Sequence, residues 1–150
     1  TNVPAGLKIT GVTNANGTVT ATITADCAAV VGSNPVTMTV TDGSGLTTTQ
    51  PVNINVTPNP LPNPGSYADQ TVALNGNLSV LPTTVASDNG SIAALDVSSP
   101  TLPGKLKINA KTGEITISKA GPVGTHVITV TATDNCGATA SKPFKLTVTN

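Results

Sequence analysis

The chain has no tryptophan and no arginine, and its 150 residues include one tyrosine, Tyr67, and one phenylalanine, Phe144. Without arginine, and with a formal net charge of zero, it lacks the clustered cations that nucleic-acid binding requires. So few aromatic rings also argue against the stacking platforms that are typical of sugar binding and single-strand binding. We therefore expect no nucleic-acid partner, and the sequence names no small-molecule ligand.

Long apolar runs are also missing. No run approaches the ~18 residues that a membrane helix needs, and no signal-peptide pattern is present, so we expect no membrane insertion. The chain opens with Thr1 instead of Met, from which we expect a processed or excised segment of a longer protein.

Threonine is abundant: it occurs 27 times, whereas charged residues make up only 9% of the chain. Apolar residues follow period two nearly everywhere, and Gly, Pro and Asn interrupt them at short intervals. This pattern predicts an all-β chain with thin sandwich cores.

An internal repeat indicates how the chain is divided into modules. Pro35–Thr57 and Val127–Thr149 align without a gap, 92 positions apart, and each contains a strand, an Asp-led turn and a second strand with a matched proline. A repeat of this size predicts tandem β modules. We expect a partial module at 1–57, a proline-rich linker at 58–65 and a complete module at 66–150.

The second module carries seven short strand patterns. The expected strands are Gln70–Leu74, Leu78–Leu81, Ile92–Ser98, Leu106–Asn109, Glu114–Ser118, His126–Thr133 and Thr139–Thr149. Seven strands that each have one polar face fit an immunoglobulin-like sandwich. The linker holds four prolines, Pro58, Pro60, Pro62 and Pro64, which favour a stiff polyproline II spacer.

The first module carries only four strand patterns. They are Leu7–Thr13, Thr18–Ala25, Val36–Thr41 and Thr47–Thr57, and they match strands four to seven of the second module. Its apolar residues, Leu7, Ile9, Val19, Ile23, Val36, Met38, Val40, Ile54 and Val56, then have too few partners. We expect strands from elsewhere to complete it, either from upstream in a longer chain or from a neighbouring subunit by strand addition.

The segment Leu106–Val148, LKINAKTGEITISKAGPVGTHVITVTATDNCGATASKPFKLTV, resembles putative Ig and dystroglycan-type cadherin-like repeats. The stretch Ser66–Val72, SYADQTV, is similar to the openings of such modules. The resemblance covers the second module well and the first more loosely. It implies an Ig-like fold in a bacterial extracellular or cell-surface protein, where such repeats form stalks, adhesin arms, enzyme accessories and fibres. Fold analogy does not choose among these roles.

Each module has one cysteine, so a bridge within either module is excluded. In an Ig-like module, the loop between strands five and six lies at the end where the chain leaves, and the loop between strands six and seven lies where it enters. Cys27 falls in the first kind of loop and Cys136 in the second, so both should face the same junction. We expect a Cys27–Cys136 disulfide; two free thiols and pairing between chains are the alternatives.

No residue pattern indicates catalysis. His126 is the only histidine and Glu114 the only glutamate, and no G-x-S-x-G turn or spaced carboxylate pair is present. Asp42 and Asp134 fit turn caps better than calcium ligands, because no further acidic cluster accompanies them. We expect neither an enzyme nor a metal or cofactor site.

These observations favour a structural repeat segment of an extracellular surface fibre, filament or adhesin stalk. Its partners would be other copies of itself or adjacent Ig-like repeats. The alternative is an adhesive or carbohydrate-binding accessory module of a larger secreted protein.

Overall fold

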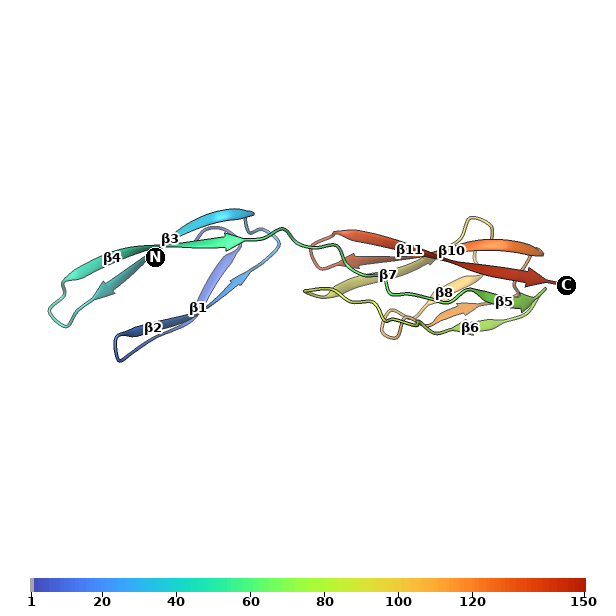
Figure 1. Ribbon diagram of the computed structural model, residues 1–150, viewed down its shortest axis with the longest axis horizontal. Coiled ribbons are helices and arrows are strands. Elements are labelled where there is room, and N and C mark those ends of the chain that lie inside the picture. The colour runs from blue at the N-terminus through green and yellow to red at the C-terminus, as the bar shows by residue number, and fades with distance from the viewer. Residues whose placement is uncertain (1) are drawn as a thin grey trace. The chain divides into compact units, whose positions relative to one another are not determined.

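The computed structural model describes residues 2–150, and over that range the chain is all-β with eleven strands. It divides into two compact units, Thr1–Asn59 and Pro60–Asn150, named unit 1 and unit 2 here (Figure 1). The all-β prediction is confirmed. Each unit has its own sheets.

Unit 2 is a sandwich of two sheets. Its strands are β5 (Gln70–Ala73), β6 (Leu78–Val80), β7 (Ile92–Ser98), β8 (Leu106–Ile108), β9 (Ile115–Ile117), β10 (Gly124–Asp134) and β11 (Thr139–Thr149). One sheet has the order β5-β11-β10-β7 and the other β6-β9-β8. All pairs are antiparallel except β5 with β11. The seven predicted strands are all present, and their ends differ from the predicted ones by two residues at most.

The core of unit 2 follows from strict alternation along these strands. Ile128, Val130 and Ala132 of β10 are at most 1% exposed, while the threonines between them lie on the other face. Ile115 and Ile117 of β9 meet them from the opposite sheet and are fully buried. Because each strand has one apolar face, packing the two sheets face to face closes a single core.

Unit 1 consists of two separate hairpins. Its strands are β1 (Leu7–Ala15), β2 (Thr18–Ala25), β3 (Gly32–Thr41) and β4 (Thr47–Val56). β1 pairs with β2 and β3 pairs with β4, each as a two-stranded antiparallel sheet. The predicted strands are all found, although β1 runs on to Ala15 and β3 begins earlier, at Gly32.

The internal repeat is a repeat of one hairpin geometry. In β3–β4, Gly32 lies opposite Val56, and in β10–β11, Gly124 lies opposite Val148. Each of these residues is 92 positions from its counterpart, so the two hairpins share the same register throughout. The sequence similarity therefore reflects an equivalent local structure.

One end of unit 1 is closed. The amide of Asp26 donates to the carbonyl of Gly6 at 2.8 Å, and a Cβ on Gly6 would lie 2.1 Å from the amide nitrogen of Ala29. Only glycine permits this approach of the β2–β3 loop to the start of β1. At the same end Leu7 and Val36 are 9% and 5% exposed. Towards their tips the two hairpins separate (Figure 1), and the side chains there are exposed.

The stretch predicted as a linker is partly ordered. Asn63 exchanges backbone hydrogen bonds with Ser87 at 2.8 and 3.0 Å, and Pro62 and Pro64 are buried. Gly65 follows with φ of 87°, and Ser66 forms a further bridge to Thr84. Residues from Pro60 onward belong to unit 2, which the proline count alone does not reveal.

The two hairpins allow a matched test of core packing. Leu146 of β11 is fully buried, whereas Ile54, its counterpart in β4, is only partly buried. We expect Leu146→Ala to lower the free energy of unfolding of unit 2 by about 2–5 kcal/mol, because it leaves a cavity in a closed core. Ile54→Ala should cost less, since the site is already partly solvated. Urea unfolding of both variants checks this, and equal losses would contradict the difference in packing.

Candidate functional site

In both repeated hairpins, an aspartate in the turn accepts hydrogen bonds from backbone amides. The Asp42 carboxylate accepts the amides of Ser44 and Leu46 at 2.8 and 2.9 Å. Asp134 accepts the amides of Cys136 and Ala138, each at 2.8 Å. The predicted role of these two aspartates as turn caps is confirmed.

In unit 2, both edges of the β10–β11 hairpin are occupied. β7 pairs with β10 over Thr129–Asp134, and β5 pairs with β11 over Leu146–Thr149. In the other sheet, β6 pairs with the outer edge of β9. These three strands, β5, β6 and β7, are the ones for which the first module has no sequence counterpart.

In unit 1 the equivalent edges are open. Among residues 2–150, β3 pairs with β4 alone and β2 pairs with β1 alone. The 92-residue offset places the vacant edge of β3 at Thr37–Asp42 and that of β4 at Ile54–Thr57. Unit 1 therefore presents unused backbone hydrogen-bonding groups where unit 2 has strands, as the sequence predicts.

The open edges leave apolar side chains exposed. Val40 is 39% exposed, while its counterpart Ala132 is fully buried. Val52 is 41% exposed, and its counterpart Phe144 is 4% exposed. In unit 2 the additional strands β6 and β7 contribute Val80 and Leu95 to the core around these positions, and unit 1 has no counterpart of them among residues 2–150.

Hydrogen-bond alternation decides which groups of β3 face the open edge. The amide of Asp42 donates to the carbonyl of Leu46 at 2.9 Å. In an antiparallel ladder such bonded pairs alternate with pairs whose polar groups point away from each other. The amides and carbonyls of Thr37, Thr39 and Thr41 therefore point away from β4.

The same alternation holds in unit 2. Thr129, Thr131 and Thr133 of β10 are the counterparts of the three threonines, and they lie opposite Ser98, Asp96 and Ala94 of β7. The three threonines of β3 thus form a vacant backbone site for an antiparallel strand. The sequence predicted unpaired strands in this module, but it did not show which backbone groups face outward.

The matched prolines Pro51 and Pro143 limit strand pairing at the outer edges of β4 and β11. Pro51 lies opposite Thr37, and Pro143 lies opposite Thr129, each in a pair that needs no amide from the proline. The proline nitrogen faces the outer edge, where it has no hydrogen to offer a further strand. In unit 2 the β5 pairing accordingly begins beyond the proline, at Leu146.

Both cysteines lie in the loops predicted for them. Cys27 lies between β2 and β3, and Cys136 lies in the turn between β10 and β11. Both cysteines are disulfide-bonded.

The two aromatic rings are used inside unit 2. Tyr67 stacks on Phe144 with ring centroids 5.3 Å apart and an interplanar angle of 24°. The Tyr67 hydroxyl donates to the carbonyl of Gly113 at 2.6 Å, and burial raises the pKa of this hydroxyl. One face of each ring is therefore occupied by the other ring.

His126 is buried in unit 2, and both of its ring nitrogens are within hydrogen-bond distance of a partner. Its side chain is 4% exposed, with Nδ1 2.8 Å from the Thr101 hydroxyl and Nε2 2.8 Å from the carbonyl of Pro122. The carbonyl can only accept, so Nε2 donates to it, and in the neutral ring Nδ1 accepts from the Thr101 hydroxyl. Across residues 2–150, no group of three or more His, Cys, Asp and Glu side chains is placed to hold a metal ion.

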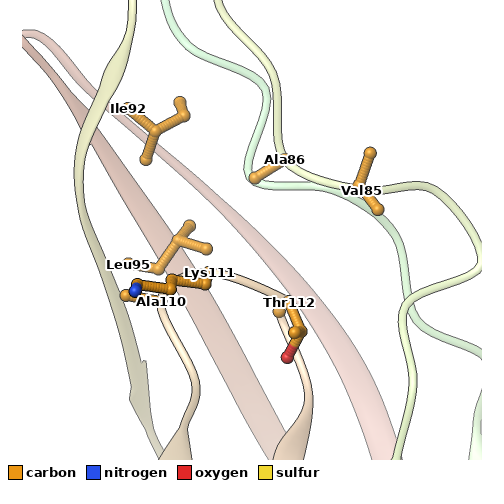
Figure 2. A pocket seen from close by; sticks show the side chains of 8 residues that line it. Val85, Ala86, Ile92, Leu95, Ala110, Lys111 and Thr112 are labelled. Atoms are coloured by element: carbon orange, nitrogen blue, oxygen red, sulfur yellow. The ribbon is translucent and has the colours of Figure 1, made fainter.

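A shallow pocket lies beside β7 (Figure 2). It has a volume of about 200 Å³, which is below the range of about 300–1,000 Å³ usual for ligand sites. Its lining is aliphatic apart from one threonine and one lysine: Val85, Ala86, Ile92, Leu95, Ala110, Lys111, Thr112 and Gly113. With no aromatic ring or carboxylate in this lining, the pocket offers little to orient a ligand.

One known protein family matches this chain. The family model described as "Putative Ig domain" matches residues 59–149, which is more than half of the chain. Among curated proteins no relative matches this sequence. In the described part of the chain, no helix is long and apolar enough to cross a membrane.

Solved structures share the architecture at low identity. The titin domains Z1Z2, crystallised in complex with telethonin, match with a TM-score of 0.51 and 17% identity, covering 97% of this chain and 73% of theirs. The Ig1-2 module of the Drosophila receptor protein tyrosine phosphatase DLAR matches at 0.46 and 12%, covering 98% and 76%. A SusE-like, surface-located polysaccharide-binding protein of Bacteroides thetaiotaomicron matches at 0.44 and 14%, covering 97% and 36%. At these identities the likeness shows the fold alone.

The Tyr67 hydroxyl predicts a loss of stability at alkaline pH. Its pKa in unit 2 is raised above the ordinary value of 10.0, so the unfolded chain releases this proton first as the pH rises. Stability from this group is full below about pH 10 and falls above it. Tyr67→Phe should cost about 1 kcal/mol at pH 7, through the lost hydrogen bond, and should lose less stability than the wild type above pH 10. Urea unfolding between pH 7 and 11 checks this; parallel pH profiles would contradict it.

Proposed function

This chain belongs to the Putative Ig domain family, and on that premise we propose that it is a structural repeat segment of an extracellular surface fibre, filament or adhesin stalk. It acts there as a rigid, non-enzymatic spacer. Its partners are other copies of itself or adjacent Ig-like repeats. Two disulfide-bonded cysteines and an Ig-like fold are consistent with an extracellular protein or a cell-surface one.

One observation carries the proposal: unit 1 exposes apolar positions that the same hairpin buries in unit 2. Val40 and Val52 are 39% and 41% exposed, against 0% and 4% for their counterparts. A unit with such surfaces suits an array, where neighbours cover them, better than an isolated domain.

Strand addition is the means by which unit 1 would be completed. The donor is either a segment upstream in a longer chain or a neighbouring subunit. In the second case the contact is heterologous, and copies join head to tail into an open fibre. The vacant edge of β4 at Ile54–Thr57 supports this, because β11 accepts the parallel strand β5 at the same positions.

Rigidity would come from a Cys27–Cys136 bridge, which we propose joins the two units. Both cysteines are disulfide-bonded, and the chain contains no others. Such a bridge closes a loop of about 110 residues, for which the chain-entropy model gives about 4–5 kcal/mol. It would also restrict the motion that the residues between the units allow.

The alternative is an adhesive or carbohydrate-binding accessory module. The stacking of the two aromatic rings on each other and the small, largely aliphatic pocket count against it.

The bridge has a direct test. Peptide mapping without reduction should recover one disulfide-linked pair of peptides, containing Cys27 and Cys136, from monomeric chain. Cys136→Ser is a mild variant, because Ser44 occupies the same turn position in unit 1 with the same 2.8 Å bond to its aspartate. This variant should keep both folds but broaden the distribution of distances between the units in small-angle scattering. Peptides linked only between chains would contradict the proposal.

Two measurements distinguish the structural spacer from the carbohydrate-binding module. On a glycan array the oxidised chain should bind no sugar above the level of a matched Ig-like control domain. Electron microscopy of the native assembly should show it within the shaft of a fibre or stalk. Sugar-specific binding, or labelling confined to a tip, would favour the accessory module.

A further inference from the structure

Residues 37–41 of the vacant β3 edge are uncharged and regular, and Asp42 ends this stretch. Thr37–Thr41 reads Thr-Met-Thr-Val-Thr, with its outward backbone groups on the three threonines. Natural edge strands are commonly protected by lysine, proline or a bulge. β4 has Pro51, β1 has a bulge between Thr10 and Thr13, and β3 has Pro35, whose nitrogen faces the same edge as the three threonines. Residues 37–41 of β3 have none of these features and form the part of the edge that is open to a further strand.

Unit 2 shows which kind of strand fits this edge. β7 places Leu95 opposite Ala132 and Val97 opposite Val130, with Asp96 between them opposite Thr131. The occupant therefore places large apolar residues at the second and fourth of five positions, with both side chains towards the core and a polar residue between them.

The β3 strand of another copy has this same pattern. Thr37–Thr41 supplies two apolar residues, Met38 and Val40, separated and flanked by threonines, as Ala94–Ser98 supplies Leu95 and Val97. A second copy offers no spare β7, because that strand is paired with β10 and packed in its own core through Leu95. Its own β3 is open and has the required alternation.

We propose that unit 1 binds a second copy of this chain by antiparallel pairing of β3 with β3 about a two-fold axis at Thr39. Thr37 of each copy then lies opposite Thr41 of the other, and Thr39 lies opposite Thr39. This register brings all three outward threonines into bonded pairs, whereas a shift of one residue would set outward groups against inward ones. Met38 of each copy lies beside Val40 of the other on the inner face.

The contact enlarges the two-stranded sheet of unit 1 to four strands, β4-β3-β3-β4, and covers part of the exposed Val40. It is isologous, so it closes as a dimer. It goes beyond the spacer function, since it holds for this chain whether the chain is a spacer or a binding module. A β7-like donor strand from upstream would compete with it for the β3 edge. The β4 edge stays free, so head-to-tail strand addition there is compatible with it.

The primary test is self-association of the whole oxidised chain. Sedimentation equilibrium should show a monomer–dimer equilibrium between about 10 μM and 1 mM, in the affinity range of small interfaces. Thr39→Pro should weaken dimerisation at least tenfold, because it removes an amide that faces the partner and none that bonds β4.

Thr49→Pro is the matched control. Thr49 lies opposite Thr39 in the same hairpin pair, and its amide faces the other edge of the sheet. This variant should dimerise like the wild type, with circular dichroism confirming that both variants are folded. A wild-type chain that is monomeric at about 1 mM, or equal effects of the two prolines, would overturn the proposal.

A second pair of variants does not depend on tolerance for proline. Thr39→Cys should form a disulfide-linked dimer under mild oxidation, since residues opposite each other in a bonded pair have Cα atoms about 5.5 Å apart. Thr49→Cys should not. Equal cross-linking of both variants would contradict the register. A monomer whose β3 edge binds a peptide of residues 91–99 would show that a β7-like strand is the occupant and would overturn the choice of a second copy.

Discussion

Backbone hydrogen bonding at the edges of one hairpin is the constraint on which this structure depends. The hairpin occurs twice with the same register, the same aspartate turn and the same outward-facing proline. In unit 2 its edges are occupied by β5 and β7, and the sandwich closes behind them. In unit 1 the same edges have no strand within the described residues, and the two hairpins remain separate sheets.

The difference in burial between the units follows from this constraint. In unit 2 the additional strands contribute Val80 and Leu95 to the core, and Ala132 and Phe144 are enclosed, while Val40 and Val52 in unit 1 are not. Hydrogen bonding and hydrophobic burial are thus coupled, since one strand supplies both. A half-sandwich keeps its local geometry because the turn caps and the hairpin ladder need no neighbours.

The two units differ in the groups that they offer to a binding partner. In unit 2 the two aromatic rings stack on each other, the histidine is buried and hydrogen-bonded, and the pocket beside β7 is small. Unit 1 offers main-chain groups and an alternating apolar face, which recognise another strand rather than a small molecule. Assembly is therefore the activity that the arrangement of these residues best supports.

The sequence by itself determined the strands, the repeated hairpin, the turn aspartates and the lack of partners for unit 1, because each depends on local alternation or on residues close in the chain. Only the tertiary structure showed that Asn63 bridges Ser87, that Tyr67 stacks on Phe144, and that Thr37, Thr39 and Thr41 direct their backbone groups outward. The first two are contacts between residues distant in sequence, which alternation does not encode. The third depends on which pairs of the ladder are bonded, and only the observed register decides that.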